Sequence, residues 1–544
     1  MSARRRVWLA AAAASCALAL TACTRSGSGA AAPGAGAPEG PVLVRGGGPD
    51  PDSLDPQKVR GAEAQGIVRD LCEGLTTLDR SAAVAPGVAS HWSVSADGKV
   101  YTFSLRPEAR WSNGERVVAA DFVAGLRRLV DPATASGYAQ YADVIANTDE
   151  IVAGGKPPEA LGVAAPDDST VVVTLSAPAP YLPALLSHPS TCPVHRPTLA
   201  SHPDSYARPG VMVGDGAFVL KEWVQGSYIL AARNHYYWND AATRLGAVKY
   251  LVISDENAEL ARYRGGELQV TAVVPRGQFD WIREHLGAEL HVSPQLTTYY
   301  YGFNLRRAPF SDQPQLRRAL SLVIDREKLA SLVLRVGELP AYGWVPPGID
   351  NYTPQSFDYR GVAMEARIAE AQRLYREAGY SPKKPLAFEL AYNAAEVHTK
   401  LAVAVASMWK EALGAEVRLT QVEFKTLLQQ IDRGDVELFR SSWAGDYNDA
   451  QTFAQYLKSD FGLNLPRYRS AAYDALLTRA AAEVDSGKRR ALLEEAERVM
   501  LADTPLMPLY FYVNKHLVKP QVLGWYDNVM NVTYSRDLGL EGPH

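Results

Sequence analysis

One region in the C-terminal half of the chain switches repeatedly between two hydrophobic patterns. Strands are predicted for Pro385–Tyr392, Ala415–Val422 and Val436–Trp443, where apolar residues alternate with polar ones or form short runs. The two segments between them, His398–Gly414 and Lys425–Gly434, repeat apolar residues with a helical period and end at a glycine, as helices often do. The pattern predicts a doubly wound α/β unit with parallel strands and right-handed crossovers.

This order of elements brings polar side chains to one edge of the predicted sheet. Asn393 and His398 follow the first strand, Arg440 lies near the end of the third strand, and Asp446 comes just past it. The carboxyl ends of parallel strands share an edge, and ligands of open α/β sheets bind beyond that edge. We therefore expect a ligand site there.

The N-terminal half carries shorter elements. Asp97–Val117 contains an Asp-Gly and an Asn-Gly dipeptide between β-rich runs, which predicts hairpins. Ala119–Pro132 places Phe122, Leu126 and Val130 four residues apart before a proline, which predicts an amphipathic helix that ends there. These elements predict a small α+β lobe.

The first residues resemble a secretory signal. Arg4–Arg6 precede a short apolar stretch, and Leu20–Cys23 resembles the lipobox of bacterial lipoproteins. We therefore expect residues 1–22 to be a lipoprotein signal peptide, Cys23 to be lipidated, and residues 23–40 to be a flexible tether rich in glycine, alanine and proline. An unrelated cysteine beside an ordinary cleavage site is the alternative.

Length and composition agree with a soluble globular protein of two or three lobes behind this signal. The chain has 544 residues, of which 47% are hydrophobic and 21% charged. Its formal net charge of -4 gives no basic field for phosphate backbones, so nucleic acid is not expected as a partner.

Cysteine use indicates little disulfide structure. Cys16 leaves with the signal and Cys23 is assigned to lipid, so Cys72 and Cys192 remain in the mature protein. An oxidising compartment permits a bond between them, but a single distant pair makes no disulfide framework, and the sequence does not favour the bond.

A secreted hydrolase is the competing class, and its motifs are missing. The sequence has no G-x-S-x-G, H-E-x-x-H, C-x-x-C or P-loop, and its histidines show no metal-ligand spacing. Asp446 and Asp449 lie close together in a loop, which is a common coincidence rather than a glycosidase pair. We expect no enzyme activity, no cofactor and no metal site.

Further blocks, in order along nearly the whole mature chain, match one known family: Asp52–Val59, Arg69–Leu75, Tyr101–Val123, Asp131–Tyr141, His188–Val194, Gly216–Trp223, Tyr236–Asp240, Tyr263–Leu268, Gly337–Pro347, Ser441–Asp449 and Tyr510–Pro520. Through them the chain resembles the oligopeptide-binding proteins of bacterial ABC importers, within the family 5 extracellular solute-binding proteins. The resemblance implies an α/β, type II periplasmic-binding-protein-like clamshell with two-hinge closure around the ligand. It implies three lobes: a base lobe (41–72, 197–296 and 514–544), a small inserted lobe (73–196) and an α/β lobe (297–513).

The resemblance also implies roles for individual residues. Asp446 matches the acid that binds the peptide ammonium, and Arg440 matches the arginine that receives the carboxylate of a tripeptide. His398, with Asn393 nearby, matches a residue beside the carboxylate of longer peptides. Tyr138 matches a tyrosine that hydrogen-bonds the peptide. A solvated Asx-turn, a structural salt bridge, a helix cap and a core position are the respective alternatives.

The remaining matched residues belong to the wall of the site. Trp443 matches an aromatic residue beside the peptide, and the flanking Ser442, Ala444 and Gly445 are expected to let an extended peptide pair with the protein strand. Tyr141 is expected to be an alternative to Tyr138 or a core residue, and Asp449 is left as a solvated side chain.

Departures from the family pattern concentrate at the carboxylate end. Arg60 stands in place of a glutamate, Leu334 in place of a lysine for the longest peptides, and Ile431 in place of an additional arginine. Arg335 is adjacent to Leu334, and Arg433 follows Ile431 two residues on. Peptide length preference and use of murein peptide are therefore open.

The prediction for function is a lipid-anchored receptor that binds short peptides between its lobes and delivers them to an ABC permease. We expect a monomer in the periplasm or on the outer face of the cell membrane. Binding of murein peptide, a signalling peptide or another solute by the same fold is the first alternative, and a secreted hydrolase is the second.

Overall fold

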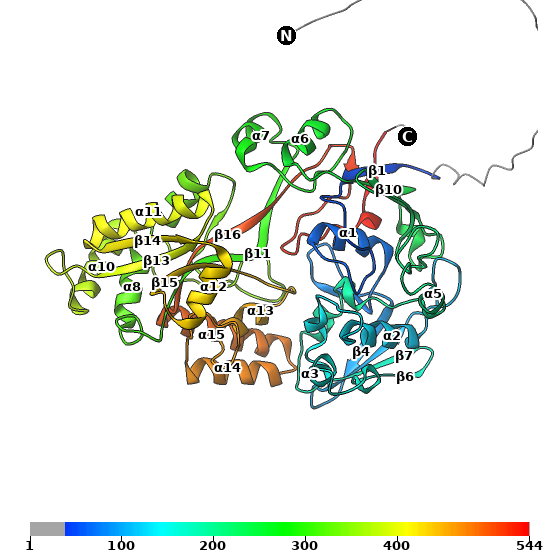
Figure 1. Cartoon of the computed structure of the whole chain (residues 1–544), viewed down its shortest axis with the longest axis horizontal. Coiled ribbons are helices and arrows are strands. Elements are labelled where there is room, and N and C mark those ends of the chain that lie inside the picture. The colour runs from blue at the N-terminus through cyan, green and yellow to red at the C-terminus, as the bar shows by residue number, and fades with distance from the viewer. Residues whose placement is uncertain (1–38, 543–544) are drawn as a thin grey trace, which may run out of the picture. The chain divides into compact units, whose positions relative to one another are not determined.

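The computed structural model describes residues 39–542 (Figure 1). The predicted signal peptide, the predicted lipidation site at Cys23 and nearly all of the tether lie outside the described residues. Within residues 39–542, no helix is both long enough and apolar enough to cross a membrane.

The largest sheet has six strands in the order β12-β16-β11-β15-β13-β14. β13 pairs in parallel with β14 and β15, which confirms the α/β unit predicted from the hydrophobic pattern. The two long strands, β11 and β16, pair antiparallel with each other. The strands are β11 (Leu290–Phe303), β12 (Leu339–Pro340), β13 (Ala387–Asn393), β14 (Glu416–Val422), β15 (Leu438–Ala444) and β16 (Leu506–Leu517).

The two predicted helices of this unit are α11 (Glu396–Leu413) and α12 (Phe424–Arg433). Each ends at a glycine in the left-handed region, Gly414 (φ 72°) and Gly434 (φ 78°), as the sequence predicts. The core of the unit is strongly aromatic. The other helices here are α8 (Pro314–Leu322), α9 (Arg326–Lys328), α10 (Met364–Glu377), α13 (Gln451–Ala454), α14 (Ala471–Ala482) and α15 (Ser486–Asp503).

A second, antiparallel sheet has the order β4-β5-β7-β6 and its own core. The Asp-Gly turn joins β4 to β5 as predicted, whereas the Asn-Gly turn supports only a single bridge between Arg110 and Arg116. The predicted helix is α2 (Ala119–Val130). The other elements are β2 (Thr76–Leu78), β3 (Val84–Pro86), β4 (Ala89–Val94), β5 (Val100–Leu105), β6 (Val163–Asp167), β7 (Thr170–Thr174), α3 (Thr148–Val152) and α4 (Leu182–Leu185).

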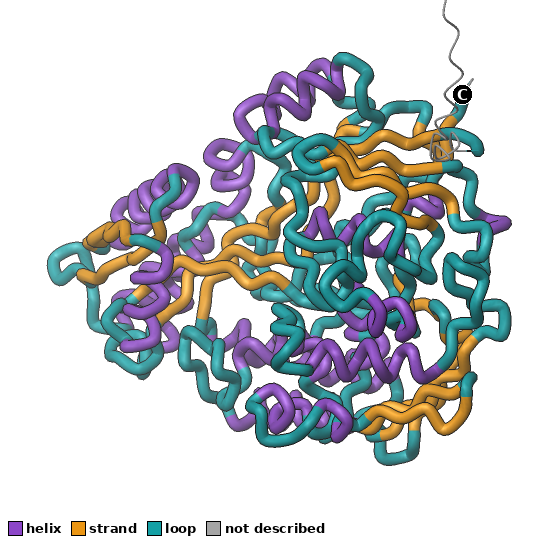
Figure 2. Tube along the Cα trace, turned by 45° about the vertical axis from the view of Figure 1, so that its right-hand side comes forward, coloured by secondary structure: helices purple, strands orange, loops and turns teal. Residues whose placement is uncertain are grey.

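A third sheet, in the order β1-β10-β9-β8, is built from segments far apart in the chain. β1 and β10 are parallel, and the other pairs are antiparallel. Figure 2 shows the three sheets as separate groups of strands, and each has its own hydrophobic core. The elements are β1 (Val42–Gly46), β8 (Phe218–Val224), β9 (Tyr228–Arg233), β10 (Ala247–Leu251), β17 (Val522–Leu523), β18 (Gly539–Leu540), α1 (Ala62–Leu71), α5 (Arg196–Ser201), α6 (Glu256–Arg264) and α7 (Phe279–His285).

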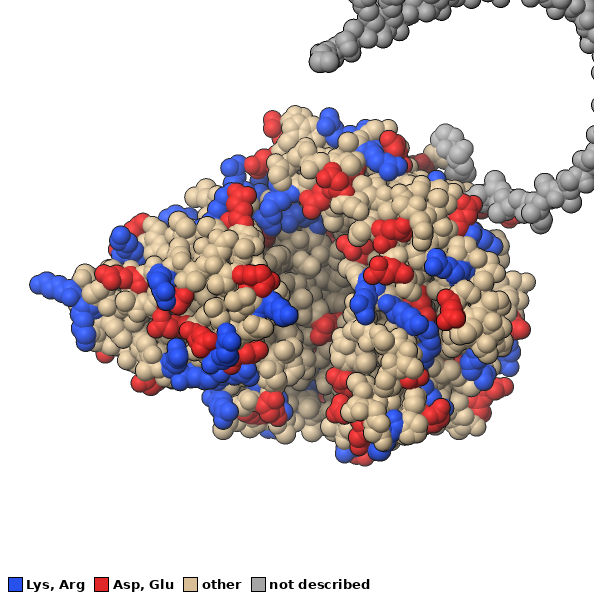
Figure 3. Space-filling view, in the orientation of Figure 1, with Lys and Arg blue, Asp and Glu red and all other residues tan. Residues whose placement is uncertain are grey.

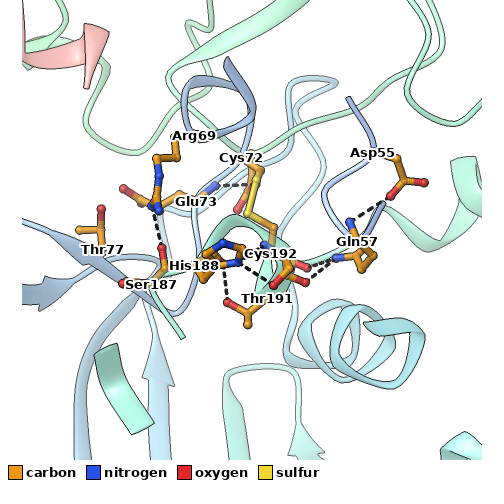
Figure 4. Close-up of a disulfide and its surroundings, with 12 residues drawn as sticks. Asp55, Gln57, Arg69, Cys72, Glu73, Thr77, Ser187, His188, Thr191 and Cys192 are labelled. Atoms are coloured by element: carbon orange, nitrogen blue, oxygen red, sulfur yellow. Dashed lines mark hydrogen bonds between the residues drawn. A yellow bond between two sulfur atoms is a disulfide. The ribbon is translucent and has the colours of Figure 1, made fainter. Parts of the chain in front are cut away.

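Cys72 and Cys192 form a disulfide, which the sequence did not favour (Figure 4). Cys72 directly follows α1, and all strands of the second sheet lie between the two cysteines in sequence. Gln57 donates hydrogen bonds to the carbonyl oxygens of Ser190 (3.2 Å) and Cys192 (3.0 Å). The bond therefore ties the two ends of the inserted segment together, a pairing of distant residues that no local pattern encodes.

Candidate ligand-binding site

β15 divides the predicted site residues between the two faces of the large sheet. Arg440 and Ser442 stand opposite Tyr301 and Tyr299 of β11, and Ala444 stands opposite Thr297. Because side chains alternate along a strand, these residues share one face and Trp443 lies on the other. Trp443 donates from Nε1 to the carbonyl of Thr452 (2.8 Å) and packs against the Tyr456 ring at 4.6 Å.

Arg440 is buried at the junction of three strands. It donates to Oδ1 of Asn393 at the end of β13 (3.0 Å) and to the Tyr512 hydroxyl of β16 (3.2 Å). Its guanidinium carbon lies 4.6 Å from the centre of the Tyr299 ring. Within residues 39–542, its buried Nε has no hydrogen-bond partner. The sheet therefore presents one oriented cation, and the predicted neighbour Asn393 helps to orient it.

His398 lies in the first turn of α11, and only 7% of its surface is exposed. Its Nδ1 is 3.3 Å from the Tyr299 hydroxyl. Burial, followed by the positive charges of Arg440 and Arg276, lowers the pKa of His398 from 6.5 to about 4. At neutral pH the ring is uncharged, so His398 can offer a hydrogen bond to a carboxylate but no opposite charge.

Asp446 lies in the loop after β15, and its carboxylate makes no hydrogen bond or ion pair with any side chain or backbone group of residues 39–542. The loop itself is fixed, because the backbone N–H of Asp446 donates to Thr452 Oγ1 (3.2 Å) and its carbonyl accepts from the Tyr141 hydroxyl (2.8 Å). The side chain is accessible to solvent, yet the surrounding protein removes enough water to raise its pKa. The Asp446 carboxylate is therefore a hydrogen-bond acceptor that has no cationic partner among residues 39–542.

Aromatic rings from the inserted segment stand beside Asp446. Tyr141, the position the sequence treated as the alternative to Tyr138, is buried and holds the Asp446 backbone. Tyr138 is half-buried, with its ring 4.9 Å from that of His188, and Tyr141 stacks on His188 at 4.0 Å. The sequence analysis missed His188 as a support of this wall, although it begins one of the matched blocks.

Gly445 and Asp449, which lie close to Asp446 in sequence, stabilise the loop. A Cβ atom on Gly445 would lie 2.7 Å from Leu296 Cδ2, so only glycine fits between β15 and the loop. Asp449 was expected to be solvated, and that expectation is wrong: its carboxylate forms a bidentate pair with Arg489 at 2.7 and 2.8 Å. This pair ties the loop to α15.

Two of the positions that depart from the family pattern, Leu334 and Ile431, have uncharged side chains. Leu334 and Ile431 are buried, at 4% and 2% exposure. Arg335, next to Leu334, is paired with Asp280 at 2.6 Å. Arg60 is exposed on the surface. Figure 3 shows a hollow on one face of the molecule, with an acidic side chain inside it and basic side chains on its rim.

Comparison with known proteins places this geometry in a family. The model of the bacterial extracellular solute-binding proteins, family 5 (middle region), matches residues 83–464. The chain belongs to this family. Among its relatives, the periplasmic oligopeptide-binding protein OppA of Escherichia coli is 40% identical over 91% of this chain and 92% of its own length. The probable deoxycholate-binding periplasmic protein YgiS of Escherichia coli is 41% identical over 90% and 92%.

Solved structures of family 5 proteins show the same α/β fold. The unliganded open form of the periplasmic murein tripeptide-binding protein MppA has a TM-score of 0.88 at 37% identity, covering 92% of this chain and 98% of its own. Another structure of the Escherichia coli murein tripeptide-binding protein MppA scores 0.70 at the same identity, covering 92% and 99%. The two identities are equal, so the higher TM-score means that the described residues superpose more closely on the open form than on the second structure.

Proposed function

We propose that this family 5 protein binds short peptides in an extended conformation, with the ammonium on Asp446 and the carboxylate on Arg440. The lone carboxylate of Asp446 is the observation that carries the proposal, because an acid with no protein cation is a site for a positive ligand group. Asp446 and Arg440 are six positions apart, so their Cα atoms are at most about 20 Å apart. A short extended peptide spans this distance together with the side chains of Asp446 and Arg440.

The remaining parts of the proposal follow from this binding mode. β13 pairs with β15 only at Leu438 and Phe439, so the backbone of Ser442 and Ala444 has an unpaired edge that an extended peptide could use, with Gly445 completing the strand end. The receptor would close its base, inserted and α/β lobes around the peptide and pass it to an ABC permease without catalysis. Lipid on Cys23 would hold it at the membrane, a point that mass spectrometry of the mature N-terminus tests directly.

Calorimetric titration with one tripeptide in its free, N-acetylated and C-amidated forms tests the binding mode. Each charge-assisted contact contributes roughly 1.5–3 kcal/mol, so blocking either end is expected to weaken binding by about ten- to a hundredfold. The Asp446→Asn variant is titrated with the same peptides. Its control is Glu416→Gln, which removes an exposed acid at the start of β14. Equal affinity for free, N-acetylated and C-amidated peptides would overturn the proposal.

The YgiS relative gives a second candidate, a solute with a carboxylate but no ammonium. Such a ligand would need Arg440 and not Asp446. Deoxycholate titrated into the wild type and the Asp446→Asn variant separates the two cases, because unchanged affinity in the variant, together with no binding of peptides, supports this candidate over ours.

A further inference from the structure

A second pocket lies where the second sheet meets helices α14 and α15. It encloses about 360 Å³, which is within the size range of small-molecule sites in proteins. β4 and β5 provide one of its walls, and α14 and α15 provide another. None of Arg440, His398 and Asp446 is among the described residues that line it. The pocket is therefore distinct from the site proposed for the peptide.

The walls of this pocket are mainly apolar and aromatic. Trp92 and Tyr101 come from the second sheet, Tyr181 lies directly before α4, and Leu493 comes from α15. The Tyr181 ring stacks on that of Tyr447 with 5.1 Å between their centres, so its orientation is fixed. Such walls favour a ligand with an apolar body.

One acid that lines the pocket, Asp350, has no partner for its charge. Within residues 39–542, its carboxylate forms no ion pair and no hydrogen bond with another side chain. The backbone N–H of Asp350 donates to Oδ1 of Asn448 (3.0 Å), and Asn448 donates to the carbonyl of Ala82 (2.7 Å), so this acid is held in place. Burial raises the pKa of Asp350, and the negative charges of Asp449 and Asp79 raise it further. A cationic ligand would relieve this excess of negative charge.

The two arginines that line the pocket already have acidic partners. Arg489 forms the bidentate pair with Asp449, and Arg490 places Nε 3.6 Å from Oε1 of Glu494. Each positive charge is therefore balanced by its own acid. The carboxylate of Asp350 then determines which charge the pocket prefers in a ligand.

We propose that this pocket binds a small organic cation, with its ammonium group on Asp350 and its apolar body against the aromatic wall. The carboxylate supplies the opposite charge for a charge-assisted hydrogen bond. The rings of Trp92 and Tyr181 add faces of negative potential, which attract cations. The inference does not depend on the proposed function, because the pocket is lined by other residues than the peptide site.

The competing explanation is a water-filled gap between two parts of the protein, which would not distinguish ligands by charge. Benzylammonium and benzyl alcohol share the same aromatic body and are nearly equal in size, but only benzylammonium is positively charged at neutral pH. Asp350→Asn removes the acid and keeps the shape of the side chain. Asp446→Asn removes the unpaired acid of the peptide site and is the matched control.

NMR titration of both compounds into the wild type and the two variants tests the inference, and urea unfolding checks that each variant keeps its fold. The wild type is expected to prefer benzylammonium over benzyl alcohol. Asp350→Asn is expected to bind benzylammonium about tenfold more weakly, whereas Asp446→Asn is expected to bind it as the wild type does. A third variant, Ala481→Leu, fills part of the pocket from α14 and is expected to weaken binding of benzylammonium as well.

Two results would overturn the inference while leaving the proposed function intact. The first is that the wild type does not bind benzylammonium, or binds it no more tightly than Asp350→Asn does. The second is that Asp446→Asn loses the binding and Asp350→Asn keeps it, which would place the cation in the peptide site.

Discussion

His398 gives a prediction whose size follows from the structure. In the fold the neutral imidazole is packed against Tyr299, with Arg440 and Arg276 nearby, and its pKa is about 4. The unfolded chain has a pKa near 6.5 for the same ring. As pH falls, the unfolded chain therefore takes up the proton first, and stability is lost between pH 6.5 and pH 4.

The magnitude follows from linkage. One pKa unit corresponds to about 1.4 kcal/mol, so the native state should lose about 2 kcal/mol on going from pH 7 to pH 5 because of His398 alone. His398→Gln lacks the titrating group and should lose that much less stability. Urea unfolding at the two pH values measures both free energies, and His91→Gln, at an exposed histidine of β4, is the control.

The comparison between variant and wild type isolates this ring, because other buried histidines such as His188 and His516 titrate in both proteins. If wild type and His398→Gln lose the same stability between pH 7 and pH 5, the ring is not held neutral by its surroundings. A carboxylate could then be received by a charged histidine.

Two further predictions concern stability around the site. Loop-closure entropy predicts that Cys72→Ala/Cys192→Ala lowers the free energy of unfolding by up to about 5 kcal/mol. Urea unfolding of the variant and of the oxidised wild type measures the difference. No loss would mean that the disulfide does not constrain the unfolded chain. Arg489→Met leaves Asp449 as an uncompensated, largely buried acid and should cost about 3 kcal/mol, with weaker peptide binding because the Asp446 loop is freed. A stable Arg489→Met variant with unchanged affinity contradicts that role.

The sequence predicted the elements of the α/β unit closely because their signals are local. Hydrophobic period and terminal glycines such as Gly414 and Gly434 depend on neighbouring residues, so the boundaries of α11 and α12 agree with the structure within two residues or so. Parallel strand order also brought Arg440 and Asn393 together, as their 3.0 Å hydrogen bond shows.

The features that the sequence did not predict depend on pairs of distant residues. The Cys72–Cys192 bond and the Asp449–Arg489 pair join segments that no periodicity connects. The neutral state of His398 depends on burial against β11, which cannot be judged from a single strand or helix. The boundaries of the three lobes and the roles of the matched site residues stay predictions.

The charges in the ligand site form an asymmetric arrangement. At one end a single carboxylate, Asp446, has no cation among residues 39–542. Elsewhere on the sheet, the guanidinium of Arg440 is held by Asn393 and Tyr512. A carboxylate without a cation and an oriented guanidinium are the two charges that the proposed binding mode uses.

The central claim is that Asp446 binds the ligand ammonium, and one cycle of four affinities tests it. Calorimetry gives the affinity of wild type and Asp446→Asn for a free tripeptide and for its N-acetylated form. We predict that acetylation weakens binding to the wild type by at least about tenfold and has almost no effect on the variant, because the lost contact is already absent there. An equal effect of acetylation on both proteins would show that the ammonium lies elsewhere and would contradict the account.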